Sequence, residues 1–253
     1  MKLILPILIF YFSFNNSYAV EDRLEVTFMP YLFVPKMKTT LGVGNVILPE
    51  KTLSPSDVID DVDMFFEGYL LIMYGEFGFM SENIYFNLSG DSGIVNIRPS
   101  LTAQSSGDVK EWMWDHAIVY QNREWTSLKL FGGVRYFQVS MEVKADETIT
   151  PGPLPPVDFI ETGTYREHWF EGLVGIIYDY DLDEQWQLNL KSDFGYGDKE
   201  QFSSLQRAGV TYFIKDNIGL FMGFQYIFIK KDDSDVYIKQ KSYNGMLGLT
   251  FKF

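Results

Sequence analysis

The segment that decides the fold is residues 242–253, which reads SYNGMLGLTFKF. Side chains along a β-strand point alternately to its two faces. Aromatic and aliphatic side chains share one face here, and small or polar side chains share the other. A strand with one face for lipid and one for a polar interior is typical of transmembrane β-barrels. The apolar face holds Tyr243, Leu247, Leu249, Phe251 and Phe253, and the polar face holds Ser242, Asn244, Gly248, Thr250 and Lys252.

Three preceding segments, 186–196, 208–214 and 218–228, repeat this alternation. In a soluble sandwich such apolar faces would pack against a second sheet, whereas in a barrel they would face lipid. Alternation alone does not separate the two folds. The apolar sets are Trp186, Leu188, Leu190, Phe194 and Tyr196, then Ala208, Val210, Tyr212 and Ile214, then Ile218, Leu220, Met222, Phe224, Tyr226 and Phe228.

The connections between these segments favour the barrel. Tight turns alternate along the chain with longer connections, so the two kinds fall at opposite ends of an antiparallel sheet. Short periplasmic turns and longer extracellular loops are typical of outer-membrane barrels. The sequence therefore predicts an all-β, transmembrane, antiparallel up-and-down β-barrel. The tight turns are 75–78, 121–125, 181–184 and 215–217, and the long connections are 36–61, 92–108 and 145–163.

About ten strands fit between these connections, an even number as expected for a single-chain barrel, and eight strands is the alternative. Pro30 has no N–H for the ladder and predicts a bulge or a break in the first strand. Residues 70–73 are apolar on both faces, so alternation does not give their register. The predicted spans are 23–34, 62–74, 77–89, 109–121, 126–144, 164–180, 185–196, 201–214, 218–230 and 236–253.

The N-terminus predicts export. Lys2 precedes an apolar run over 3–14, and small residues lead to a cleavage site after Ala19, which is the pattern of a signal peptide. The run is shorter than the ~20 residues of a membrane-spanning helix, and no later segment offers ~18 consecutive apolar residues. We expect a signal peptide over 1–19 and a barrel domain over 20–253, placed in the outer membrane with both termini in the periplasm.

Composition excludes several classes of partner. A net charge of -13 argues against nucleic acid, which requires a basic surface. The chain has no cysteine, so no disulfide stabilises it. No cofactor or metal is expected either. Asp179, Asp181 and Asp183 have the opening spacing of a calcium loop, but Glu184 stands where that loop requires glycine.

Four short segments carry a resemblance to a known group of proteins. MPYLFVP at 29–35, the stretch 54–61, FGGVRY at 131–136 and LGLTFKF at 247–253 resemble segments of an uncharacterised group of small Gram-negative outer-membrane barrel-domain proteins with a signal peptide. Phe33 departs from that group, which more often has Trp there. The resemblance implies fold and location, and it carries over no catalytic or binding site. The C-terminal aromatics Phe251 and Phe253 also resemble the signal that barrel-assembly machinery recognises.

The polar strand faces predict a lumen lined by both charge signs. A barrel of about eight strands is filled by its own side chains, and open channels belong to 16–18 strands. The charges are expected either to form an internal salt-bridge network that rigidifies the barrel or to make a constriction selective for small polar solutes. One network can do both. The predicted lumen residues are Lys129, Arg135, Glu171, Lys191, Asp193 and Gln225.

The two histidines give weak support to an enzyme. A rim hydrolase would use His168, but the adjacent Glu167 points to the opposite face of the strand and cannot orient it. The simpler interpretation is an interfacial His168 beside Trp169 in an aromatic girdle. His116 belongs to a lipid-facing stripe over 112–120.

Three functions follow from these observations. The leading hypothesis is a non-enzymatic outer-membrane barrel that is structural or forms a narrow, porin-like channel for small solutes. The second is a surface-interaction barrel that binds through loops 36–61 and 145–163, and the third is the rim hydrolase. The expected partners are outer-membrane lipid, lipopolysaccharide and the barrel-assembly machinery, with no nucleic acid and with the chain as a monomer.

Overall fold

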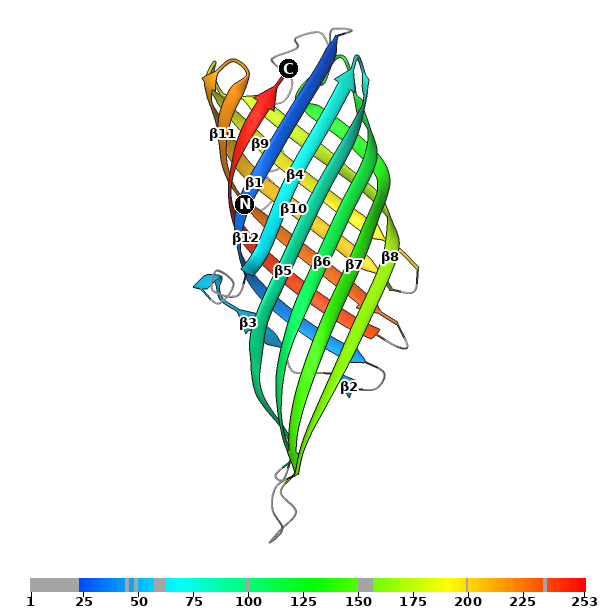
Figure 1. The fold of residues 1–253 in the computed structure, drawn as a ribbon. Helices are drawn as coiled ribbons and strands as arrows, with labels where there is room; N and C mark the ends of the chain where they lie inside the picture. Colours follow the sequence, from blue (N-terminus) through cyan, green and yellow to red (C-terminus); the bar gives the residue numbers. More distant parts are fainter. Residues whose placement is uncertain are drawn as a thin grey trace, which may run out of the picture.

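A computed structural model describes residues 23–43, 46–47, 50–56, 62–98, 101–149, 157–198, 200–233 and 236–253. Ten long strands form a closed antiparallel barrel (Figure 1). Each long strand pairs with the next along the chain, and β12 pairs with β1 to close the wall. The strands are β1 (Leu24–Val43), β4 (Val62–Tyr74), β5 (Phe77–Arg98), β6 (Leu101–Gln121), β7 (Leu128–Ile149), β8 (Val157–Asp181), β9 (Trp186–Tyr196), β10 (Phe202–Lys215), β11 (Ile218–Asp232) and β12 (Val236–Lys252).

The predicted fold class is confirmed, and the count is ten rather than eight. Two short strands, β2 (Val46–Ile47) and β3 (Lys51–Leu53), also pair with β1. The pairing of β4 with β1 ends at Tyr31. Further along β1, at residues 37–39, β3 pairs with it instead. The described part of the connection 36–61 thus continues the wall. The expected signal peptide lies outside the described residues.

Short turns and the C-terminus lie together at one end of the barrel (Figure 1). The β4–β5 turn uses Gly75, whose φ of 58° lies in the left-handed region that glycine adopts without strain. The terminal residue is joined to the first strand by two backbone hydrogen bonds with Val26, of 2.9 and 3.0 Å. The Phe251 ring stacks on Phe28 at 6.4 Å between centroids, whereas the Phe253 side chain is 75% exposed.

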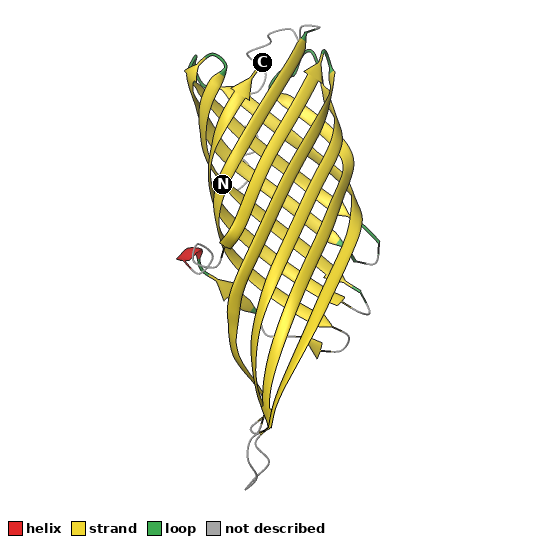
Figure 2. Ribbon diagram, viewed as in Figure 1, coloured by secondary structure: helices red, strands yellow, loops and turns green. Residues whose placement is uncertain are grey.

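At the opposite end β5, β6, β7 and β8 project far beyond the other strands (Figures 1 and 2). The prediction of long loops at 92–108 and 145–163 was therefore wrong for most of those residues, which extend these four strands. The physical reason is that strands pair through backbone hydrogen bonds, which do not themselves require apolar and polar side chains to alternate. The alternation that marks lipid-crossing strands is then not needed, although the backbone ladder continues.

Pro30 does not break β1, contrary to the sequence-based expectation. The register of β1 against β4 runs without a shift through the pair Pro30–Gly68. Against β12 the pairing skips Met29 and Pro30 and resumes at Tyr31 in the same register. The missing N–H is accommodated by a short gap in one ladder, so no bulge is needed.

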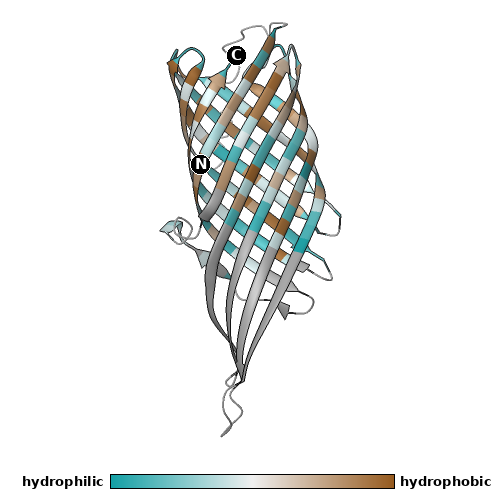
Figure 3. Cartoon of the chain, viewed as in Figure 1, coloured by the Kyte–Doolittle hydropathy of each residue, from teal (hydrophilic) through white to brown (hydrophobic). Residues whose placement is uncertain are grey.

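Hydrophobic and hydrophilic residues alternate along the strands of the barrel wall (Figure 3). Outward side chains such as Val174, Met222 and Leu247 are 54–62% exposed, a degree of exposure that only a lipid environment makes favourable over a whole wall. Trp112 and Trp114 stack on this outer face, 5.8 Å apart. No helix among the described residues is long and apolar enough to cross a membrane.

Candidate functional site

A layer of polar and charged side chains crosses the middle of the lumen. Each of the ten long strands contributes at least one of them, and all are 7% exposed or less. We name this layer the charged belt. It consists of Tyr31, Glu67, Glu82, Asp115, Arg135, Glu171, Lys191, Asp193, Arg207, Gln225 and Asn244.

Strand register places the belt residues beside one another. Glu82, Asp115, Arg135 and Glu171 stand directly opposite one another in sequence across β5, β6, β7 and β8. A second row, Lys191, Arg207, Gln225 and Asn244, crosses β9 to β12 in the same way. Directly opposed residues on one face of a sheet lie within contact distance. The belt is therefore a product of the antiparallel ladder.

Arg135 is the centre of one half of the belt and is fully buried. Its guanidinium donates to both carboxylate oxygens of Asp115, at 2.7 and 2.6 Å, and to Asp193 at 2.9 Å. A further bond of 2.9 Å reaches the Ser203 hydroxyl, which itself donates to Glu171. The two-pronged contact with Asp115 is the strong, directional form of an ion pair.

Arg207 is the centre of the other half. It donates to Glu67 at 2.9 Å and also pairs with Glu82. Lys191 binds Glu82 as well and lies 3.1 Å from a carboxylate oxygen of Asp193, so it joins the two halves.

The side-chain amides of Gln225 and Asn244 extend the hydrogen-bond network of the belt to β11 and β12. Gln225 donates to Glu67 at 2.9 Å and accepts from Asn244 at 2.8 Å. The Tyr31 hydroxyl accepts a bond of 3.3 Å from Arg207.

A glycine makes room for the carboxylate of Glu171. A Cβ atom at Gly195 would lie 2.2 Å from a carboxylate oxygen of Glu171 and 2.5 Å from the Ser203 hydroxyl. Both distances are far below van der Waals contact, so any larger residue would displace the Glu171–Ser203 hydrogen bond.

Beyond the belt, on the side of the projecting strands, a layer of apolar side chains fills the lumen. Phe137 stacks on Trp169 with centroids 4.7 Å apart, and Phe33 packs edge-on against Phe65 at 5.3 Å. Two successive layers thus close the interior, which leaves Arg135, Gln225 and Phe137 with no exposed surface. The other members of this apolar layer are Ile84, Phe86, Met113, Val139, Ile227, Ile229 and Ile238.

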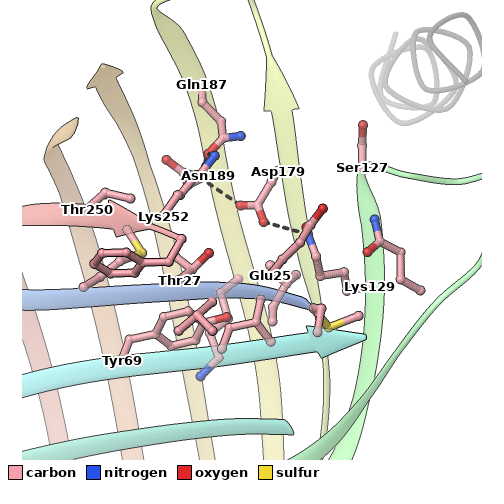
Figure 4. Close-up of a pocket in the computed structure, with 18 of the residues that line it drawn as sticks. Glu25, Thr27, Tyr69, Ser127, Lys129, Asp179, Gln187, Asn189, Thr250 and Lys252 are labelled. Carbon is pink, nitrogen blue, oxygen red and sulfur yellow. Dashed lines mark hydrogen bonds and ion pairs between the residues drawn. The ribbon is translucent and has the colours of Figure 1, made fainter. Parts of the chain in front are cut away.

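On the other side of the belt the lumen opens into a cavity of about 790 Å³, which we name the vestibule (Figure 4). It lies at the end of the short turns, and Lys191 and Arg207 line its inner end. In its wall Lys129 pairs with Asp179 at 3.0 Å, and Asn189 donates to the same carboxylate at 2.9 Å. The lumen is therefore accessible from one end only as far as the belt.

The structure places the six predicted lumen residues inside the barrel. Arg135, Glu171, Lys191, Asp193 and Gln225 are belt residues, and Lys129 lies in the vestibule wall. The prediction omitted Tyr31, Glu67, Glu82, Asp115, Arg207 and Asn244. Most of these could have been predicted from the alternation of side chains along a strand. For example, if the stripe over 112–120 faces lipid, Asp115 must face the lumen.

The two histidines lie on the outer wall. His116 stacks on Phe79 at 5.8 Å, and His168 is exposed and lies 6.4 Å from the Tyr136 ring. Glu167 points inward and pairs with Lys231, so the two neighbours do not meet. Trp169 is buried in the lumen rather than placed beside His168 in a girdle, because it has the inward parity of Glu167. Within the described residues no group of three or more His, Cys, Asp or Glu could hold a metal ion.

Solved outer-membrane barrels share this fold at low sequence identity. The outer membrane protease OmpT from Escherichia coli aligns with 95% of this chain and 100% of its own, with 11% identity and a TM-score of 0.59. The translocator domain of the autotransporter NalP from Neisseria meningitidis aligns with 100% of this chain and 95% of its own, with 11% identity and a TM-score of 0.46. No protein-family model and no curated protein matches the sequence. The chain has the closed, ten-stranded fold of an outer-membrane β-barrel.

Proposed function

We propose that the chain is an integral outer-membrane barrel with a closed lumen, structural in role rather than an open porin. The observation that carries this is the charged belt, in which Arg135, Glu67 and Gln225 have no exposed surface. The apolar outer wall supports residence in lipid, and the sorting of turns and projecting strands supports short turns in the periplasm. In the narrow-channel alternative the belt side chains would have to move apart to open a path, and several buried ion pairs would break at once.

Planar-bilayer recording tests the closed lumen. We expect the refolded wild-type chain to give no stable conductance steps across the range of applied potentials, because the belt and the apolar layer both block the path. A general porin refolded and inserted by the same procedure is the positive control. Heat-modifiable gel migration and a β-rich circular dichroism spectrum show that the inserted material is folded. Reproducible ohmic steps from such material would overturn the closed lumen and restore the channel hypothesis.

The projecting sheet favours a second role, binding at the cell surface. β8 begins at Val157 but pairs with β9 only from Gly172 onward, and β5 runs to Arg98 although its pairing with β4 ends at Leu88. In the described pairings both outer strands of the projecting sheet thus have a free edge. Free strand edges can add an extended segment of another protein. We propose this sheet as the binding region of such a surface-interaction barrel.

Shortening the two projecting hairpins tests this second role. Residues 92–105 and 146–160 are each replaced by an Asn-Gly turn, which keeps the remaining pairs in register. We expect the shortened barrel to stay heat-modifiable, because the described pairs that are removed lie beyond those of the barrel wall. We also expect bacteria that display the shortened barrel to lose adhesion to a panel of matrix proteins. Equal adhesion by both forms, at equal surface amounts, would remove support for binding through the sheet.

A further inference from the structure

The vestibule is built in two parts, one polar and one apolar. Leu71 on β4, Thr27 on β1 and Lys252 on β12 stand directly opposite one another across three neighbouring strands. The apolar surface continues from Leu71 to Met29 and Met73 in the same cavity. A cationic head group and an apolar wall are therefore adjacent within a volume of about 790 Å³, which is inside the range of small-molecule sites.

Lys252 is the cation of this cavity that has no carboxylate partner among the described residues. An ammonium group carries three N–H donors. In the described residues the Lys252 ammonium makes one hydrogen bond, of 3.3 Å to Gln187, and lies 4.4 Å from the centre of the Phe213 ring. No described carboxylate lies within ion-pair distance of it. The other four cations of the cavity wall each pair with a carboxylate: Arg23 with Glu25, Lys129 with Asp179, and Lys191 and Arg207 with Glu82.

Two buried polar atoms in the vestibule wall also have no hydrogen-bond partner among the described residues, Oγ1 of Thr250 and Nε of Arg207. Thr250 precedes Lys252 by two positions on β12, so both side chains face the lumen (Figure 4). Buried polar groups are normally satisfied. An unsatisfied hydroxyl beside an ammonium with free donors indicates that an acceptor from outside the chain completes the site.

None of the described acidic residues of the vestibule accepts a hydrogen bond from Lys252 or Thr250. Asp179 is paired with Lys129, and Glu25 is paired with Arg23 at 2.9 Å. Asp181 accepts a bond of 2.7 Å from Gln187, and Asp216 lies exposed in the β10–β11 turn at the mouth. Among the described residues Lys252 is thus the cation of the cavity wall without a carboxylate within ion-pair distance, and Asp181 and Asp216 have no cation within that distance.

We propose that the vestibule binds a small amphipathic carboxylate. Its carboxylate accepts from Lys252 and Thr250, and its apolar body packs on Leu71 and the two methionines beside it. This site opens toward the short turns, so it takes the ligand from the side that we assign to the periplasm. The inference does not depend on a closed lumen, because Lys252, Thr250 and Leu71 line the vestibule and are not belt residues.

Titration of the full chain in lipid nanodiscs tests the site, since both ends of the barrel stay accessible there. The probes are 2-naphthoate and 2-naphthalenemethanol, which share an apolar body and differ in charge, and empty nanodiscs give the lipid background. We expect 2-naphthoate to bind more tightly than the alcohol. Lys252→Met should weaken 2-naphthoate about tenfold, the worth of one charge-assisted hydrogen bond, and leave the alcohol unchanged. Lys230→Met, at the far end of the barrel, is the matched control and should change neither probe.

A second readout does not depend on the folding of a variant. In the wild-type chain, 2-naphthoate should protect Lys252 from acetylation, measured by mass spectrometry, and should leave exposed Lys230 unprotected. Two results would overturn the proposal: equal binding of 2-naphthoate to the wild type and to Lys252→Met, or acetylation of Lys252 that 2-naphthoate does not slow. Conductance together with carboxylate binding would overturn only the closed lumen, and absence of both conductance and carboxylate binding would overturn only the vestibule inference.

Discussion

The Glu82→Lys variant is expected to yield no compact barrel on refolding in detergent, whereas the wild type and Glu82→Gln do. Glu82 is 1% exposed and pairs with both Lys191 and Arg207. Charge reversal would place three cations in contact away from water. An uncompensated buried ion costs several kcal/mol, and a typical domain has only about 5–15 kcal/mol of total stability. The measurement is gel migration of unboiled and boiled samples, with far-ultraviolet circular dichroism.

The matched control is a charge reversal at an exposed pair. Lys230 pairs with Glu200 at 2.9 Å on the rim, where water and salt screen the charges. Lys230→Glu is expected to refold as the wild type does. If Glu82→Lys gave a heat-modifiable barrel with the wild-type unfolding midpoint, the belt would not be the closed, water-free layer described above.

The faces of the strands could be predicted from the sequence because alternation has a period of two. The outward assignment of Ala208 and Val210, for example, requires Arg207 to face inward. Which cation meets which carboxylate could not be predicted. Lys191 on β9 reaches Glu82 on β5, which lies across the lumen and 109 residues away in the chain. That contact depends on the stagger of all ten strands, and no single strand encodes it.

The length of the projecting sheet could not be predicted for a different reason. The residues over 92–108 include NIRPSLTAQSSGD, a stretch with Pro, Ser and Gly and no sustained alternation, which is typical of a loop. The pairing of β5 with β6 nevertheless continues to Arg98 and Leu101. Alternation marks strands that separate two different environments. The β5–β6 ladder continues through 92–108 without that signal, because backbone hydrogen bonds alone hold it together.

Arg135→Met is expected to lower the free energy of unfolding by about 3–5 kcal/mol, the usual cost of removing one partner from a buried ion pair. Methionine fills much of the same volume, so the loss is electrostatic rather than a cavity effect. Arg135 holds Asp115 by two bonds and Asp193 by one, and Asp115 is left with only Lys191, at 3.9 Å. The measurement is guanidinium unfolding in lipid vesicles or detergent, and the exposed Lys230→Met variant, with no measurable change expected, is the control.

The double variant Arg135→Met with Asp115→Leu distinguishes the loss of charge pairing from simple damage to packing. If orphaned carboxylates cause the destabilisation, removal of Asp115 as well should restore part of the stability, because buried ion pairs replaced by apolar residues of similar size are often tolerated. Asp193 keeps Lys191 at 3.1 Å in this variant, so its charge stays paired. The double variant should therefore be more stable than Arg135→Met alone, a non-additivity that residues in direct contact are expected to show. A double variant less stable than either single one would mean that the belt holds the barrel by shape, and that its charges are incidental to folding.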